Sequence, residues 1–243
     1  MRLFHSGGPH FLLLFFAACA PAALPGLADT RTLELVKAHA QRPEDFAPLL
    51  TDDAEVVRAG QLARGREGAA LLATLEPAGE TELYRHHDVS LLKLGDGRAV
   101  LLQRRADDRI TRAIELPVPV QGDPMPWQGL YYSKAWNVDE DGPRMALLNA
   151  VWAREGRYVD GTNDRTGPEA VSEMIARFRN LVFGTQVNAT TGMADVGNGW
   201  FTWDWVILSR QGGRTLFFGV DVMHLDAEGK IDFLAGFVNG SRH

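Results

Sequence analysis

Two aspartates in the second half of the chain, Asp160 and Asp221, stand where a carboxyl group could carry proton chemistry. Tyr158 lies two residues before Asp160, and Phe217 and Met223 flank Asp221 at even spacing. Side chains at even spacing along a β-strand share one face, so each carboxyl is expected beside aromatic or methionine side chains. Such neighbours solvate a charge poorly, which raises the pKa of a carboxyl and suits it to act as a general base.

Both aspartates also have ordinary structural roles open to them. Asp160 precedes residues 161–164, which read GTND, and aspartate commonly caps a turn of this kind. Asp221 could pair with an arginine such as Arg214 or accept a hydrogen bond from the backbone. The residue types alone therefore leave a chemical and a structural role open for each aspartate.

Other residue types that carry chemistry are poorly placed. His86 and His87 are adjacent, so on a strand they would face opposite ways, and we expect surface histidines rather than metal ligands. His224 falls on the strand face opposite to Asp221, and we expect it at an interface. The chain has one cysteine, Cys19, and neither a Gly-x-Ser-x-Gly motif nor a phosphate-loop pattern. We expect no metal and no cofactor.

The amino terminus has the pattern of an export signal. Residues 11–20 read FLLLFFAACA, an apolar run too short to span a bilayer, after a positive residue at Arg2. Cys19 follows small residues and resembles the lipid-bearing cysteine of a bacterial lipoprotein signal; cleavage after Ala28 is the alternative. We expect an exported protein of the periplasm or cell envelope, attached to a membrane only through a lipid at Cys19.

A proline-rich segment divides the rest of the chain. Residues 117–126 contain four prolines in ten positions, which neither a helix nor a central strand tolerates. We predict an export signal over residues 1–28, a first segment over 29–116, a linker over 117–126 and a second segment over 127–243. The net charge of −6, without a basic run, argues against a nucleic-acid partner.

The second segment places helices first and antiparallel strands afterwards, the order typical of an α+β domain. Helices are predicted over residues 127–136, from 141 to a stop at Gly156, and from a capping box at 166–169 to Leu181. Strands are predicted over residues 157–160, 185–193, 199–208, 215–225 and 231–238.

Two of these strands are apolar on both faces. Trp200 faces away from Trp203, and Phe217 faces away from Phe218. An antiparallel sheet with one wet face would alternate polar and apolar residues. The outer face of the sheet is therefore expected to be covered, either by the first segment or by a second copy of the chain.

The first segment repeats the order of the second in a weaker form. A strand near residues 49–57, a helix near 64–75 and strands near 82–94, 98–105 and 110–116 follow one another in the same way. Gly65 precedes its helix as Gly167 does, an offset of 102 residues, and Ile110 follows its turn as Ile231 does, an offset of 121. We predict a tandem repeat of one fold.

The two offsets contrast the copies at the positions of interest. Arg58 stands at the position of Asp160, and Val100 at the position of Asp221. The first copy lacks both acids, so a single chemical site is predicted in the second copy. The first copy would serve as a packing or docking partner.

Two runs, LLNAVWAREGRYVDGTNDRTGPEAV and GVDVMHLDAEGKIDFLAGF, give the second segment a specific resemblance. Nearly the whole segment resembles the SnoaL-like, ketosteroid-isomerase-like superfamily, which includes the nuclear transport factor fold. The resemblance implies a curved antiparallel sheet wrapped by helices into a cone with a mostly apolar pocket at its open end. It also implies that two copies of this chain could form a homodimer through the sheet.

The resemblance assigns roles to individual residues. Ketosteroid isomerases carry an aspartate base on the first strand, which corresponds to Asp160. A second aspartate, held neutral to donate a hydrogen bond to an enolate oxygen, corresponds to Asp221. A tyrosine on the first helix corresponds to Tyr132, with Tyr131 as an alternative. The isomerase pattern has proline after its first aspartate, where this chain has Gly161.

Two functions follow from this interpretation. The first is an exported isomerase, cyclase or hydratase without a cofactor, acting on a small hydrophobic carbonyl compound that contacts Tyr158, Phe217, Met223 and Trp203. The second is a cell-envelope module that binds a ligand or assists assembly without catalysis, which the degenerate first copy and the lipoprotein-like signal favour. The fold hosts many activities, so the resemblance does not choose between them.

Overall fold

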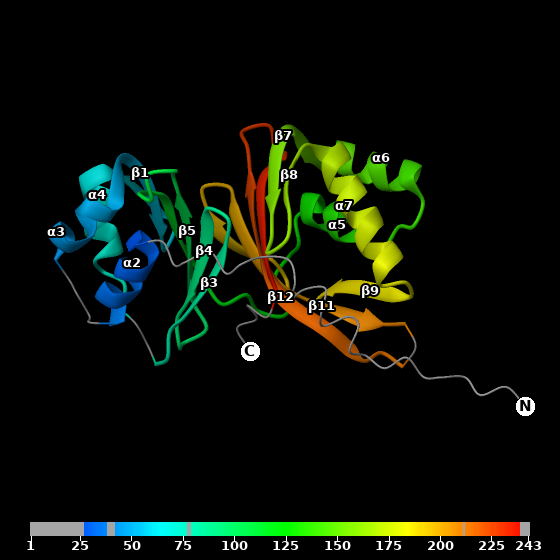
Figure 1. Cartoon of the computed structure of the whole chain (residues 1–243), viewed down its shortest axis with the longest axis horizontal. Helices are drawn as coiled ribbons and strands as arrows, with labels where there is room; N and C mark the ends of the chain where they lie inside the picture. Colours follow the sequence, from blue (N-terminus) through cyan, green and yellow to red (C-terminus); the bar gives the residue numbers. More distant parts are fainter. Residues whose placement is uncertain (1–26, 38–41, 77–78, 211, 239–243) are drawn as a thin grey trace, which may run out of the picture.

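A computed structural model describes residues 27–37, 42–76, 79–210 and 212–238. Residues 1–26 of the predicted export signal, with Cys19, lie outside these residues, and its last two residues begin the first described helix. Figure 1 shows two lobes whose sheets face each other at the centre, with the helices of each lobe on its outer side. The predicted α+β class with two curved sheets is confirmed. Within the described ranges, no helix is long and apolar enough to cross a membrane.

Each lobe is one copy of the repeat. The N-terminal copy contains α2 (Leu27–Lys37), α3 (Pro43–Phe46), the 3-10 helix η1 (Ala47–Leu49), β1 (Leu50–Arg58), β2 (Gln61–Arg64), α4 (Gly65–Leu72), β3 (Glu82–His86), β4 (Val89–Lys93), β5 (Ala99–Arg104) and β6 (Ile110–Leu116). The C-terminal copy contains α5 (Trp127–Ala135), α6 (Asp141–Val151), β7 (Trp152–Val159), β8 (Asp164–Thr166), α7 (Pro168–Leu181), β9 (Thr185–Ala189), β10 (Ala194–Gly197), β11 (Trp200–Ser209), β12 (Thr215–Leu225) and β13 (Ile231–Val238). The connecting residues 117–126 form neither helix nor strand.

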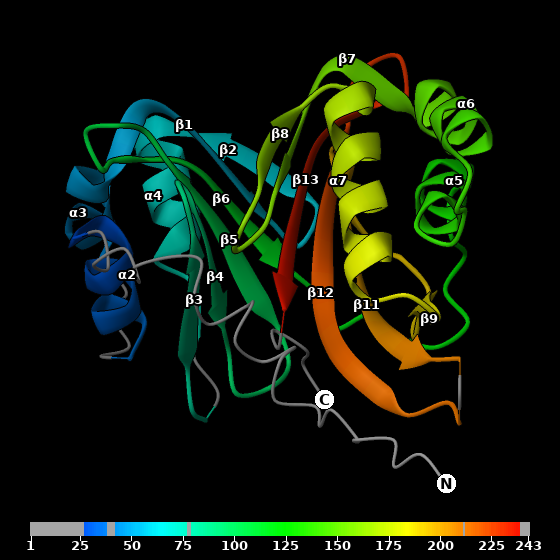
Figure 2. The same cartoon turned by 45° about the vertical axis from the view of Figure 1, so that its right-hand side comes forward.

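The two sheets share one topology. The strand order is β2-β1-β6-β5-β4-β3 in the N-terminal copy and β8-β7-β13-β12-β11-β10 in the C-terminal copy, where β9 is added beside β11. In both copies the first strand pairs in parallel with the last strand and antiparallel with the short strand that follows it. Figure 2 shows α5 and α7 across from β11 and β12, so these helices and strands enclose the interior of the C-terminal copy.

The pairing of individual residues follows the same repeat. Leu50 lies opposite Ile110 in the N-terminal copy, and Trp152 lies opposite Ile231 in the C-terminal copy. The first residues of these pairs are 102 positions apart and the second residues 121, which are the offsets read from the turns in the sequence. The two copies are therefore equivalent residue by residue along these strands.

The outer faces of the two sheets pack against each other in one buried apolar layer. The N-terminal copy supplies Val57, Val89, Leu91, Ala99, Leu101, Ile114 and Leu116, and the C-terminal copy supplies Val159, Val196, Trp200, Val220, Val222, Phe233, Ala235 and Phe237. The first segment thus covers the outer face of the second sheet. A second copy of the chain was the alternative for covering this face, and here it carries the other half of the same chain.

The interior of the N-terminal copy is filled where the C-terminal copy is open. Val100, at the position of Asp221, belongs to an aliphatic cluster with Val56, Leu92, Leu94 and Leu102. Arg58, at the position of Asp160, pairs with Glu115 across 3.1 Å between Nε and Oε2. Hydrocarbon and an internal ion pair have replaced both acids in this copy.

One helix end and one helix cap differ from the prediction. The second helix of the C-terminal copy ends at Val151, and Gly156 lies within β7. A methyl group on Gly156 would lie 2.6 Å from Nε1 of Trp152, so this glycine makes room for the indole, which donates a hydrogen bond to its carbonyl at 3.0 Å. The capping box before α7 was also wrong: Gly167 occupies the cap with a φ of 85°, and no side chain caps the helix, although Pro168 does begin it.

Two long strands were predicted where the chain turns. Residues 82–94 form the hairpin β3–β4, and its turn includes His87 at a φ of 52°. No glycine or proline marks this turn, so the sequence lacked the usual signal. Residues 185–193 form a strand only to Ala189, because β9 and β10 pair with different stretches of β11.

Candidate functional site

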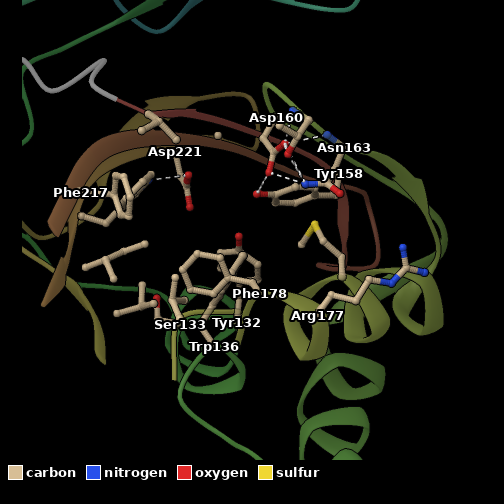
Figure 3. Close-up of a pocket in the computed structure, with 18 of the residues that line it drawn as sticks. Tyr132, Ser133, Trp136, Tyr158, Asp160, Asn163, Arg177, Phe178, Phe217 and Asp221 are labelled. Carbon is tan, nitrogen blue, oxygen red and sulfur yellow. Dashed lines mark hydrogen bonds between the residues drawn. The ribbon is translucent and has the colours of Figure 1, made fainter. Parts of the chain in front are cut away.

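A cavity of about 690 Å³ opens between α5, α7 and the inner face of the C-terminal sheet (Figure 3). This volume suits a small organic molecule. Most lining side chains are aromatic or aliphatic, including Trp136, Met174, Phe178, Leu181, Val187, Trp203, Trp205, Ile207 and Phe217. The polar lining side chains are Tyr132, Ser133, Tyr158, Asp160, Thr162, Asn163, Arg177 and Asp221.

Asp221 is a carboxyl held inside this apolar cavity. Its side chain projects from β12, the residue is 7% exposed, and the indole Nε1 of Trp205 donates a hydrogen bond to its Oδ1 at 2.8 Å. Burial raises the pKa of Asp221 to about 8; the indole hydrogen bond opposes the rise, and the charge of Asp160 adds to it. Asp221 therefore carries a proton at neutral pH. A pairing with Arg214, one of the structural roles that the sequence left open, is not found among the described residues, where Trp205 is the partner of Asp221.

Asp160 follows the last residue of β7 and is held by its own turn. Its Oδ1 accepts hydrogen bonds from the backbone N–H and hydroxyl of Thr162 at 2.7 and 3.1 Å, and from the backbone and side-chain N–H of Asn163 at 2.8 and 3.0 Å. Its Oδ2 accepts from the hydroxyl of Tyr158 at 2.9 Å and from the Asn163 side chain at 3.0 Å. Asp160 thus caps the turn and also lines the cavity.

Two phenols accompany the carboxyls. Tyr132 projects from α5, on the opposite side of the cavity from Asp160 and Asp221, and Tyr158 lies beside Asp160 (Figure 3). Burial raises the pKa of both hydroxyls well above the usual range; the charge of Asp221 adds to the effect at Tyr132, and the charge of Asp160 adds to it at Tyr158. Both side chains are therefore neutral hydrogen-bond donors at physiological pH.

Gly236 is the backbone position around which three of these groups meet. A methyl group on Gly236 would lie 3.0 Å from Oδ1 of Asp221, 3.4 Å from the hydroxyl of Tyr158 and 3.9 Å from Cβ of Asp160. Gly236 pairs with Asp221 across β12 and β13. The absent side chain leaves the space in which a ligand atom can approach all three residues.

The structure brings most of the predicted site residues together. Tyr132, Tyr158, Asp160, Trp203, Phe217 and Asp221 all line the cavity. Met223, which we expected to contact the ligand, is instead fully buried in the core cluster of this copy and does not line the cavity. Its strand face is right, but its position is deeper in the cone than the cavity reaches.

Sequence reasoning missed Trp205 and Gly236 as site residues. The signal at Trp205 was its indole N–H, which faces the same way as Asp221 and is a donor in need of a partner. Gly236 interrupts an otherwise apolar strand, which is a signal for close approach of another group. Among the described residues, no cluster of three or more His, Cys, Asp or Glu side chains is placed to hold a metal ion.

Comparisons with solved structures found matches that cover part of this chain. A SnoaL-like family protein from Agrobacterium tumefaciens is 27% identical with a TM-score of 0.44, over 46% of this chain and 93% of its own. An NTF2-like protein from Exiguobacterium is 16% identical with a TM-score of 0.38, over 46% and 97%. A protein with a ketosteroid isomerase-like fold from Catenulispora acidiphila is 17% identical with a TM-score of 0.38, over 46% and 85%. Each match spans most of the solved chain and just under half of this one.

Neither a family model nor a curated protein matches the chain.

Proposed function

We propose that the C-terminal copy binds a small hydrophobic carbonyl compound in its cavity and moves a proton at the carbon beside the carbonyl. The observation that carries this proposal is the carboxyl of Asp221, buried in an apolar cavity that Asp160 and Tyr132 also line, where burial raises its pKa to about 8. Neutral donors fixed in an apolar site stabilise negative charge that develops on an oxygen during a reaction. A carbonyl compound that forms an enolate develops its charge in this way.

The proposed roles divide between the two aspartates. Asp160 takes a proton from the carbon and returns it to another carbon of the same compound, so no atom is gained or lost. Asp221 and Tyr132 donate hydrogen bonds to the oxygen that becomes negative in between. The described hydrogen bond of Asp221 engages Oδ1 alone, which leaves Oδ2 for the ligand. The reaction class is an isomerisation without a cofactor.

A second candidate function, ligand binding without catalysis, is favoured by one observation. Both oxygens of Asp160 already accept hydrogen bonds, from Tyr158, Thr162 and Asn163. A carboxylate whose oxygens are already engaged has fewer lone pairs free to accept a proton from a ligand. In this alternative, Asp160 shapes the mouth of the cavity, and Asp221 holds a polar group of a bound apolar molecule.

Proton exchange distinguishes the two functions. The full-length protein is incubated in D2O with a panel of hydrophobic cyclic enones, and deuterium uptake beside the carbonyl is followed by NMR. Catalysis predicts uptake that falls about 10²- to 10⁴-fold in Asp160→Asn, the usual effect of losing a general base. Asp195→Asn is the matched control, because Asp195 is exposed on β10 of the same copy and does not line the cavity.

Each outcome of this experiment decides between the candidates. Uptake that persists in Asp160→Asn would rule out Asp160 as the base. Saturable binding of the enones without deuterium uptake would establish the non-catalytic function.

We also propose that the protein is exported and processed before Cys19 rather than after Ala28. The support is the start of α2: the backbone N–H of Ala28 donates to Asp108 at 3.0 Å, and its carbonyl accepts from the hydroxyl of Thr32 at 2.8 Å. Cleavage after Ala28 would remove both bonds and the first two residues of the helix. Mass spectrometry of the protein from its native envelope tests this, since a start at Asp29 would contradict it.

A further inference from the structure

His86 of the N-terminal copy lies against the turn that holds Asp160 in the C-terminal copy. A surface position was expected for it, but its ring stacks on Phe237 with centroids 5.1 Å apart and planes 22° apart. A methyl group on Gly161, the residue after Asp160, would lie 3.1 Å from Cε1 and 3.3 Å from Nδ1 of His86. The imidazole therefore closes over the backbone of Gly161.

This contact also accounts for a departure from the isomerase pattern. That pattern has proline where this chain has Gly161, and any side chain at this position would meet the ring of His86. Gly161 does not adopt a positive φ, so its backbone conformation does not require glycine. The missing side chain of Gly161 instead permits the close approach of the N-terminal copy.

The hairpin that carries His86 makes a second contact with the turn after Asp160. The guanidinium of Arg157 donates to both carboxylate oxygens of Asp88 at 2.6 and 2.9 Å, and to both oxygens of Asp164 at 2.8 and 2.9 Å. The turn after Asp160 is thereby fixed between an ion-pair network that includes Asp88 and the ring of His86. Both residues belong to the β3–β4 hairpin of the N-terminal copy.

We propose that His86 is a positioning residue for Asp160, so that the copy without a cavity completes the site of the copy that has one. The ring packs on Gly161 and Phe237. This packing holds the turn in the position that places the carboxyl group of Asp160 at the cavity. Its Nε2 is buried and finds no hydrogen-bond partner among the described residues. The ring thus contributes by shape and contact rather than by a hydrogen bond from Nε2.

The charges around His86 make this contact measurable. Burial lowers the pKa of His86, the negative charge of Asp160 and a hydrogen bond with the backbone of Arg85 oppose that change, and neighbouring His87 adds to it. Asp160 in turn contributes to the raised pKa of Asp221. If the turn moves, the pKa values of both His86 and Asp221 should therefore change, whether or not the protein turns over a substrate. The positioning role of His86 rests on the proposed function of Asp160, but measuring these pKa values requires no catalysis.

The first measurement is the pKa of the His86 imidazole in the full-length protein, followed by NMR. Asp160→Asn should lower it further, because the carboxylate that favours the imidazolium is gone. An unchanged value would show that the charge of Asp160 does not reach the His86 ring in solution, and would overturn the proposal.

The second measurement is a double-mutant cycle of His86 and Gly161, in which the pKa of Asp221 is followed by carboxyl NMR. His86→Ala and Gly161→Ala should each lower the pKa of Asp221, by roughly half a unit if the Asp160 charge recedes. The double variant should recover part of the loss, since the new methyl group occupies space that the ring has left. His87→Asn is the control, because His87 is exposed and asparagine tolerates its positive φ.

The cycle separates a positioning role from a structural one. If His86→Ala lowers the free energy of unfolding but leaves the pKa of Asp221 at its original value, His86 is an interface residue only, and the proposal fails. If His87→Asn shifts the pKa of Asp221 as much as His86→Ala does, the effect is a general one of the hairpin and the specific role of the ring is lost.

Discussion

At neutral pH, Asp221 keeps a proton that the unfolded chain would release. An unfolded aspartate ionises above about pH 4, whereas burial raises the pKa of Asp221 to about 8 in the fold. Between these values the unfolded chain binds fewer protons than the folded one, so the fold loses stability as the pH rises. Each pH unit in this window costs up to about 1.4 kcal/mol.

Asp221→Asn should remove this cost. An amide keeps an acceptor for Trp205 and a donor for the cavity but cannot ionise. We expect the variant and the original protein to have similar free energies of unfolding near pH 4, and the variant to gain a few kcal/mol by about pH 8. Urea unfolding at a series of pH values tests this. A gain that does not depend on pH would show that Asp221 is not protonated in the fold.

Trp205 should control how firmly Asp221 holds its proton. The indole hydrogen bond lowers the pKa of Asp221, so Trp205→Phe should raise that pKa above about 8 while keeping an aromatic ring in place. Carboxyl NMR of the variant provides the measurement. A fall in the pKa would mean that water enters the space left by the indole.

Gly236 should limit what the cavity can hold. Its replacement by valine places methyl groups among Asp221, Tyr158 and Asp160, where a single methyl already comes within 3.0 Å. We expect Gly236→Val to weaken the binding of hydrophobic ligands at least about tenfold, and Gly236→Ala to have a smaller effect. Calorimetry or fluorescence titration with an apolar probe measures both, and equal binding by all three proteins would place the ligand elsewhere.

At the scale of elements, a buried arginine fixes the helices that wall the cavity. Arg144 of α6 is 1% exposed and donates hydrogen bonds to the hydroxyl of Ser172 in α7 at 3.0 Å and to the carbonyls of Val138 and Asp139 at 3.0 and 3.1 Å. It also pairs with Asp141. These bonds tie the connection between α5 and α6 to α7.

Arg144→Leu should lower the free energy of unfolding by about 3 kcal/mol or more, because buried acceptors lose their donor. Arg154→Leu is the matched control: that side chain is 95% exposed, and we expect a change within about 0.5 kcal/mol. Thermal unfolding of both variants tests the difference. Equal losses would mean that the bonds of Arg144 contribute little.

The elements also show what the sequence could and could not predict. Periodicity and turn residues located β12 and β13 at their observed bounds, and matching turns gave the two offsets of the repeat. The turn at His87 escaped prediction because no glycine marks it, and the start of β7 at Trp152 escaped because pairing with β13 overrides a helical pattern.

For the site, the sequence could predict only which residues of one strand lie on the same face. Alternation put Asp160 beside Tyr158 and Asp221 beside Phe217, and the structure places all four at one cavity. The contact between His86 and Gly161 joins residues from different copies, so no local pattern could indicate it. Contacts across sheets depend on packing, which the sequence of one strand does not encode.

For the whole molecule, the buried layer between the sheets predicts a monomer. The face that a second chain would need is already occupied by the N-terminal copy. We expect light scattering after gel filtration to give the mass of one chain. A stable dimer would have to use another surface, and its interface would then need to be located by cross-linking.

The same layer predicts that the C-terminal copy alone is poorly soluble. Residues 127–243 without their partner would expose Trp200, Val220, Val222, Phe233 and Phe237. Such a patch promotes association. We expect the isolated segment to dimerise or aggregate, and a version with Val220→Lys and Val222→Lys to stay in solution. A monomeric, soluble segment without these changes would contradict the prediction.

Joining the two sheets through one chain changes how their association responds to dilution. Two separate subunits part when their concentration falls below their dissociation constant, whereas a short linker holds its two ends at an effective concentration on the order of millimolar. The contact between His86 and the Asp160 turn would therefore persist even where only a few molecules are present. It also ties two unlike faces together, so each face can change by mutation without imposing the same change on the other.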